Sequence, residues 1–254
     1  MIFYFSATGN CKYVAERIAA STDDEVCSIA ECMNRKQYSF DLSGGENLGF
    51  VAPTYCWALP SIVEDFLSEA DFHFKEKPYV FYVGTYGTIV GNPQYYANKY
   101  LEEKGCITDA LFDIKMPDNW TPVFDLSDKQ KVKRINENAE FLIESAIEKI
   151  RNHTHGNYMT HTAPSFIVKI AHGVSYENMR KTKHFTVKDS CIGCGICAEK
   201  CPVHAIQTDR GKPVWIKEKC VMCLGCLHRC PEFSIEYGKN TSKHGQYHNP
   251  NTKI

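Results

Sequence analysis

The chain has 254 residues, 43% of them hydrophobic, with 29 Lys and Arg against 30 Asp and Glu. This length exceeds one typical domain and fits a medium domain plus a small one. Its apolar runs are too short to cross a bilayer and its N-terminus lacks a signal-peptide pattern, so we expect a soluble, cytoplasmic protein with no membrane span.

Charge is unevenly distributed along the chain. Residues 1–150 contain 14 basic and 23 acidic side chains (net −9), whereas residues 151–254 contain 15 and 7 (net +8). This asymmetry indicates two modules of different chemistry. The bases of the second half are scattered rather than clustered, which disfavours nucleic acid as a partner.

In the first 150 residues, short apolar runs alternate with helical periodicity, a pattern typical of a parallel sheet with crossover helices. We expect strands at 2–5, 25–29, 48–52, 79–83 and 111–114. Helices are expected after residue 11, from Pro60, from Pro93 and over 129–150, the last with Leu142 on its inward face. This order predicts an α/β, flavodoxin-like doubly wound fold with a five-stranded parallel sheet.

In such a fold a ligand binds beyond the carboxyl ends of the strands, where three loops of this chain meet. The first loop places hydroxyl and amide groups at a helix N-terminus, which favours a phosphate. It is neither a Walker A loop nor a dinucleotide-binding fingerprint, so it predicts a mononucleotide. It consists of Ser6, Ala7, Thr8, Gly9, Asn10 and Cys11.

The second and third loops, residues 53–60 and 84–93, combine aromatic residues with glycines, which suits a flat ring. The alternative is that Trp57 and Tyr86 only cover the edge of the sheet. Because a phosphate loop lies at the same edge, we favour flavin mononucleotide (FMN). The candidate contacts in these loops are Pro53, Thr54, Tyr55, Trp57, Thr85, Tyr86 and Gly87.

Residues 5–10, with the position that follows, resemble the flavodoxin phosphate-loop signature, which from Ser6 onward reads serine or threonine, any residue, threonine, glycine, asparagine, threonine. The chain departs from it at the last position, where Cys11 replaces the threonine and is a poorer hydrogen-bond donor. The resemblance implies that Trp57 and Tyr86 sandwich the flavin ring, with Tyr55 as the alternative to either.

Eight of the thirteen cysteines form two groups, each reading Cys-x-x-Cys-x-x-Cys-x-x-x-Cys-Pro and offset by 29 residues, an internal duplication. In this spacing three thiolates hold one cubane and the fourth serves the other. Two zinc sites are the alternative, but zinc ligands usually come in separated pairs. We expect two [4Fe–4S] clusters. Cluster one is assigned to Cys191, Cys194, Cys197 and Cys230, and cluster two to Cys201, Cys220, Cys223 and Cys226.

His204 and His228 lie in this region, and we expect both to be structural because cysteines fill all eight ligand positions. Residues 185–238 resemble the bacterial two-cluster ferredoxins. The whole chain resembles flavodoxin–ferredoxin fusions of anaerobic bacteria, often called EFR-type ferredoxins. The resemblance implies a flavodoxin-like FMN-binding domain at 1–150, a connector at 151–184, a smaller α+β two-cluster ferredoxin domain at 185–240 and a tail at 241–254.

These cofactors predict an electron-transfer protein. Clusters exchange single electrons and a flavin takes one or two, so the chain would relay electrons between them and convert one- into two-electron steps. The alternatives are a flavin-dependent reductase of a quinone or nitro compound, and a redox or iron–sulfur sensor. We expect redox protein partners or a small-molecule electron acceptor. No acid–base pair or nucleophile stands out, so whether this oxidoreductase-type protein is an enzyme stays open.

Overall fold

A six-stranded parallel sheet forms the centre of the N-terminal unit in the computed structural model, which describes residues 1–254. The strand order is β2-β1-β4-β6-β7-β8, so the order reverses beside β1. The expected doubly wound α/β fold is therefore confirmed. Its strands are β1 (Ile2–Tyr4), β2 (Val26–Ser28), β4 (Asn47–Pro53), β6 (Tyr79–Tyr86), β7 (Ala110–Lys115) and β8 (Gly156–Asn157).

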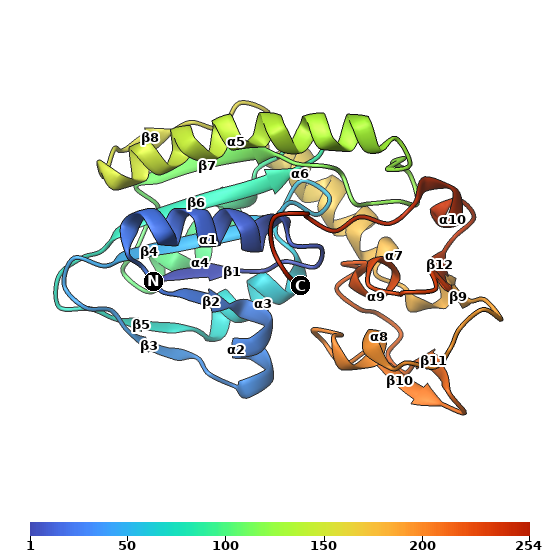
Figure 1. Cartoon of the computed structure of the whole chain (residues 1–254). Coiled ribbons are helices and arrows are strands. Elements are labelled where there is room, and N and C mark those ends of the chain that lie inside the picture. Colours follow the sequence, from blue (N-terminus) through green and yellow to red (C-terminus); the bar gives the residue numbers. More distant parts are fainter.

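Helices cover both faces of the sheet (Figure 1). On one face lie α1 (Asn10–Thr22) and α5 (Lys129–Arg151), and on the other α3 (Ser61–Glu69) and α4 (Pro93–Glu102). Successive strand residues point to opposite faces, so Ile2 enters the α1/α5 core and Phe3 the α3/α4 core. The two apolar layers fix the sheet and leave its carboxyl edge free for loops.

Four elements were not expected from the sequence. These are the helix α2 (Ile29–Arg35), the parallel pair β3 (Ser39–Asp41) and β5 (Asp71–His73), and the sixth strand β8. Each has seven residues or fewer, too few to show a hydrophobic period, and β8 contains only Gly and Asn. In α5, Leu142 is 41% exposed and its neighbour Ile143 is buried instead.

A connecting segment leads from the sheet to the C-terminal unit. It contains α6 (Ser165–Ala171), a π-helical turn (His172–Tyr176), α7 (Glu177–Met179) and a 3-10 turn (Thr182–His184). The strand β8 also falls inside residues 151–184, so part of the expected connector belongs to the large sheet.

The C-terminal unit consists of two antiparallel strand pairs with short helices between them. Its elements are β9 (Phe185–Val187), α8 (Ile196–Glu199), β10 (Ile206–Asp209), β11 (Lys212–Trp215), α9 (Gly225–His228), β12 (Ile235–Tyr237) and α10 (Thr241–His244). β10 pairs with β11 and β12 pairs with β9. The strands β10 and β12 begin 29 residues apart, at Ile206 and Ile235, so the duplication of the sequence is also a duplication of structure.

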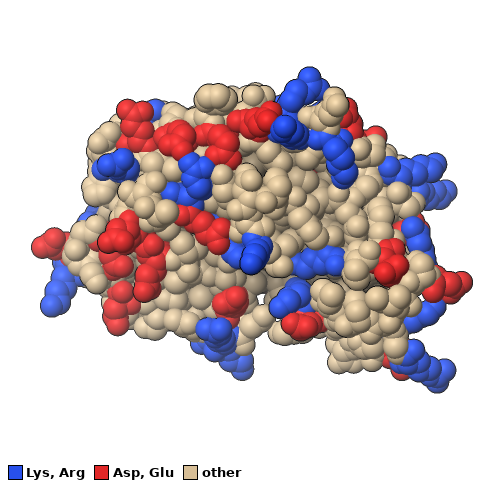
Figure 2. All heavy atoms as spheres, in the orientation of Figure 1, with Lys and Arg blue, Asp and Glu red and all other residues tan.

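Acidic side chains gather over the N-terminal unit on the face drawn in Figure 2, and basic side chains predominate along the rim of the C-terminal unit. This matches the net charges of −9 and +8 in the two halves of the sequence. No helix is both long and apolar enough to pass through a membrane.

Candidate functional site

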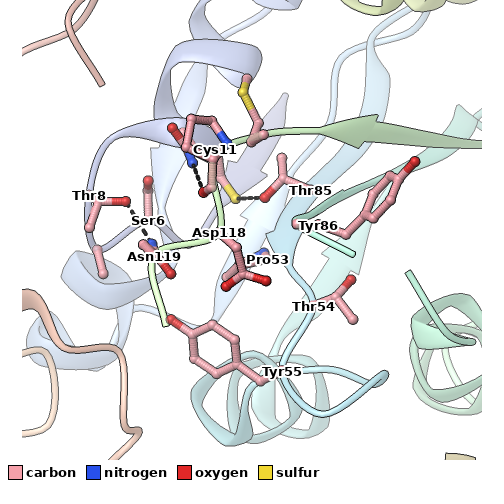
Figure 3. A pocket seen from close by; sticks show the side chains of 15 residues that line it. Ser6, Thr8, Cys11, Pro53, Thr54, Tyr55, Thr85, Tyr86, Asp118 and Asn119 are labelled. Atoms are coloured by element: carbon pink, nitrogen blue, oxygen red, sulfur yellow. Dashed lines mark hydrogen bonds between the residues drawn. The ribbon is translucent and has the colours of Figure 1, made fainter. Parts of the chain in front are cut away.

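A cavity lies at the carboxyl edge of the large sheet, between the loops that follow β1, β4, β6 and β7 (Figure 3). Eleven of the thirteen residues expected to bind a cofactor line it; Gly9 and Trp57 do not. Its lining residues are Ser6, Ala7, Thr8, Asn10, Cys11, Pro53, Thr54, Tyr55, Thr85, Tyr86, Gly87, Met116, Pro117, Asp118 and Asn119.

One end of the cavity offers free backbone donors. The N–H groups of Ala7, Thr8, Asn10 and Cys11 donate no hydrogen bond to the backbone, because they lie in the loop and in the first turn of α1. Gly9 turns the chain into the helix with a φ of 97°. No Lys or Arg lines this cavity, so its donors are neutral groups aided by the helix dipole. This set fits a single phosphate.

Cys11 joins the loop to the sheet. Its thiol lies 3.1 Å from the Thr85 hydroxyl, and the side chain is 1% exposed (Figure 3). Burial raises the pKa of the Cys11 thiol to about 12, so the group stays protonated. Cys11 therefore fills the threonine position with a neutral thiol that is bonded to β6.

A second, more apolar cavity continues from the first toward the C-terminal unit. Tyr55 lines both cavities, whereas Trp57 lines only the second. Tyr86 lines only the first, and its hydroxyl lies 2.8 Å from Nδ1 of His161. The hydroxyl of Thr54, at the junction, is buried and has no partner within the chain. These groups suit the edge and face of an aromatic ligand.

The turn that carries Trp57 is tightly built. Tyr55 and Ala58 exchange two backbone hydrogen bonds of 2.9 and 3.1 Å around Cys56 and Trp57, which both have positive φ, 47° and 70°. Such angles are costly for residues with side chains and persist only where the surroundings impose them. Gly91 packs so closely that a Cβ there would lie 2.2 Å from the Trp57 carbonyl oxygen.

Sequence reasoning missed the loop after β7, residues 116–119. Asn119 donates a hydrogen bond of 2.8 Å to the Thr8 hydroxyl. Asp118 is the only charged residue that lines either cavity. Burial raises the pKa of its carboxyl to about 6, although the Trp120 amide bonded to Oδ1 opposes this. The signal that could have identified this loop is its position after a fourth strand ending at the same edge.

The C-terminal unit brings the expected cluster-one cysteines together. A cavity there is lined by Cys191, Cys194, Cys197 and Cys230. The loop is crowded: a Cβ on Gly193 would lie 2.5 Å from the Gly211 carbonyl oxygen, at a φ of 71°. Only glycine fits this approach without strain.

The other four cysteines also lie together. Burial raises the pKa of the Cys220 thiol to about 12, and the neighbouring thiols of Cys223 and Cys201 raise it further. The pKa of the Cys226 thiol is also raised, first by burial and then by the thiols of Cys223 and Cys220. No three His, Cys, Asp or Glu side chains converge on one point suited to a single metal ion.

The two cysteine groups have equivalent surroundings. The amide of Ala205 donates to Sγ of Cys201, and the amide of Ser234 donates to Sγ of Cys230, both at 3.2 Å. In each case the donor lies four residues after the cysteine. Amide donors to ligand sulfurs are among the groups that set cluster potentials.

Comparison with known families decides the identity. Residues 1–141, more than half of the chain, match the flavodoxin domain. The chain belongs to the flavodoxin family. Residues 190–235 match the 4Fe-4S dicluster domain, so the whole chain is a flavodoxin–ferredoxin fusion, as expected.

No curated protein matches the chain. Among solved structures, a short-chain flavodoxin associated with a non-canonical PDU bacterial microcompartment is 17% identical, with a TM-score of 0.31. The comparison covers 57% of this chain and 96% of that one. The dicluster domain with its eight cysteines implies two [4Fe–4S] clusters, and the flavodoxin domain suggests a flavin. The pair of domains is that of an electron-transfer protein.

His228 joins the ferredoxin domain to the flavodoxin domain. Its Nε2 lies 2.9 Å from the Asn119 carbonyl oxygen, and its Nδ1 accepts a hydrogen bond from the Tyr247 amide, so the ring proton sits on Nε2. Burial lowers the pKa of His228 to about 4, which keeps the ring neutral. Both ring nitrogens have partners in the chain, and the residue ties the segment between Cys226 and Cys230 to the loop at the first cavity.

Proposed function

We propose that this flavodoxin–ferredoxin fusion relays electrons between FMN and two [4Fe–4S] clusters, converting between one- and two-electron steps. One observation carries the proposal: Tyr55 of the flavodoxin domain and Cys223 of the ferredoxin domain line the same cavity. A ring seated beside Tyr55 would therefore lie next to a ligand of cluster two.

The two connected cavities fit a mononucleotide in that orientation. The amides of the loop at residues 7–11 would hold the phosphate, and Thr54, Tyr55 and Asp118 would surround the ring end. The unpaired Thr54 hydroxyl supports this, because a buried polar group without a partner is costly unless a ligand satisfies it. When bound, FMN supplies a centre that accepts one or two electrons.

The exposure of the cysteines supports an order of carriers. Cys223 packs against the core of the flavodoxin domain, whereas Cys194 is exposed and its neighbour Ile192 is 64% exposed. Cluster two would thus lie at the flavin and cluster one at the surface. A redox protein partner would meet the chain at cluster one.

Direct reduction of a small electrophile, such as a quinone or nitro compound, is the second candidate. It is favoured by the second cavity, which continues past Tyr55 to Ile89, whose side chain is 41% exposed. A small acceptor could reach the ring by that route without a protein partner.

The state of the cysteines bears on the compartment. None of the thirteen cysteines forms a disulfide, which supports a reducing compartment such as the cytoplasm of an anaerobe.

Anaerobic purification with cofactor counting and an acceptor assay tests both candidates. The relay predicts one FMN and about eight irons per chain. Protein that has been reduced beforehand and freed of the reductant should pass its electrons slowly to menadione and rapidly to a one-electron protein acceptor such as cytochrome c. Zinc in place of iron, or a chain that binds no FMN, would overturn the relay. Fast reduction of menadione by pre-reduced protein that lacks the clusters would instead establish the reductase.

A further inference from the structure

The C-terminal tail, residues 245–254, returns from the ferredoxin domain and lies on the loop at residues 6–11 (Figure 1). The amide of Asn249 donates a hydrogen bond of 2.8 Å to the Thr8 carbonyl oxygen. A Cβ on Gly9 would lie 3.0 Å from both Asn249 Cβ and Thr252 Cγ2. Tyr247 and Asn249 are buried, at 5% and 3% exposed. The tail is therefore packed against the loop that lines the first cavity, although no tail residue lines the cavity itself.

Two tail side chains meet at one atom of the loop. The Tyr247 hydroxyl lies 2.7 Å from Oδ1 of Asn10, and Nδ2 of Asn249 lies 3.1 Å from the same oxygen. The Tyr247 hydroxyl also lies 3.0 Å from Oδ1 of Asn136 in α5, which anchors the ring. When the Tyr247 hydroxyl donates its proton to Asn136, Oδ1 of Asn10 still accepts a hydrogen bond from Nδ2 of Asn249.

This contact decides which end of the Asn10 amide faces the cavity. With Oδ1 occupied by the tail, the remaining polar group is Nδ2, whose partner in the chain is the Pro117 carbonyl oxygen at 3.5 Å, the limit of a hydrogen bond. Asn10 lines the cavity, which contains no Lys or Arg, so each neutral donor matters for an anion. The reverse orientation would direct a carbonyl oxygen at the phosphate and repel it.

We propose that Tyr247 and Asn249 are positioning residues that hold the Asn10 amide with Nδ2 as a donor to the flavin phosphate. The inference rests on the proposed binding of FMN. It assigns part of the phosphate site to the C-terminal tail, which follows the ferredoxin domain in the sequence. Phosphate recognition at the start of the chain then depends on its last residues.

The test compares FMN with riboflavin, which has the same ring and no phosphate. Binding to the full chain, with clusters in place and flavin removed, is followed by the loss of free-flavin fluorescence. Tyr247→Phe combined with Asn249→Ala should raise the Kd for FMN about tenfold, as expected for loss of a hydrogen bond to a charged group, and leave that for riboflavin within about twofold. Thr252→Val is the matched control, because it removes the tail hydroxyl that bonds to Glu16 and keeps the methyl group that lies near Gly9.

A double-mutant cycle with Asn10→Ala separates positioning from general damage to the fold. If the tail acts through Asn10, Asn249→Ala should have little further effect on FMN affinity in the Asn10→Ala background. Equal weakening of FMN and riboflavin, or an unchanged FMN affinity in the double tail variant, would overturn the inference. A wild-type chain that does not prefer FMN to riboflavin would overturn the proposed function itself.

Discussion

Asp118 is a carboxyl group without a positive partner at the junction of the two cavities. Its pKa is raised to about 6, chiefly by burial, so the ionised form is disfavoured. A raised pKa of an acid means that the protonated form dominates below about pH 6 and the charged form above it. Since the proposed ligand carries a phosphate, ionisation of Asp118 should weaken its binding.

Asp118→Asn should therefore strengthen FMN binding at high pH and leave it unchanged at low pH. The ratio of wild-type to variant Kd should be close to one at pH 5 and rise through about pH 6. It should reach severalfold at pH 8, since like charges repel across a partly buried site in which the effective dielectric is about 20. Fluorescence titrations from pH 5 to 8 measure this ratio, in which the ionisation of the FMN phosphate itself cancels. A ratio that does not change with pH would contradict the account.

A substitution at Gly91 tests whether the strained turn beside Tyr55 depends on close packing by a glycine. A Cβ there would lie 2.2 Å from the Trp57 carbonyl oxygen, and the φ of Gly91 is 75°. Gly91→Ala should lower the free energy of unfolding by about 1–3 kcal/mol. Gly44→Ala is the control, because its φ is not in the left-handed region and its nearest neighbour is the end of Glu76 at 3.8 Å. Equal effects of the two variants in urea unfolding would show that the turn does not depend on Gly91.

At the scale of elements, the sequence predicted the helices and strands that contain clear apolar runs or a helical period. The five principal strands and the helices α1, α3, α4 and α5 follow from apolar runs and from proline at helix starts. The exact inward face of α5 did not follow, because Leu142 and Ile143 are adjacent and equally apolar and only the packing chooses between them. The elements α2, β3, β5 and β8 are too short to show a hydrophobic period, so the sequence did not predict them.

The candidate site also has a part that the sequence predicted and a part that it did not. The loops after β1, β4 and β6 carry recognisable residue types, and eleven of the thirteen expected residues line the first cavity. Asp118 and Asn119 carry no such motif, and their place at the cavity depends on the register of β7. The contacts of Tyr247 and Asn249 join residues more than 230 positions apart, which no local pattern reports.

The π-helical turn of the connector links the two domains through Tyr176. The Tyr176 hydroxyl donates to the Val221 carbonyl oxygen at 2.9 Å and accepts a hydrogen bond from the Ser61 amide at 3.2 Å. Val221 lies between two ligands assigned to cluster two, and Ser61 opens α3. This hydroxyl therefore holds the cluster-two loop against the flavodoxin domain.

Tyr176→Phe should reduce the free energy of unfolding by about 1–3 kcal/mol, because it leaves two buried backbone groups without a partner. Anaerobic urea unfolding measures the change. Tyr95→Phe serves as the control, since Tyr95 is 56% exposed and should change stability by less than about 0.5 kcal/mol. A similar small change in both variants would mean that the hydroxyl of Tyr176 does not stabilise the contact between the domains.

At the scale of the whole molecule, three contacts tie the domains around the same edge of the sheet. Tyr176 holds the cluster-two loop, His228 bonds to the loop at Asn119, and the tail covers the loop at residues 6–11. The sequence predicted both domains but not this arrangement, because each contact joins segments that are distant along the chain. The arrangement places Cys223 beside Tyr55 and leaves Cys194 exposed.

The most direct test of the relay is photoreduction of the flavin in anaerobic, cofactor-loaded protein, with bleaching of cluster absorbance followed in time. Matched variants Cys223→Ala and Cys194→Ala should each lose about four irons per chain, one from cluster two and the other from cluster one. The account predicts that electrons pass from flavin to cluster in the wild type and in Cys194→Ala, and that this transfer is lost in Cys223→Ala. Transfer that survives in Cys223→Ala but is lost in Cys194→Ala would contradict it.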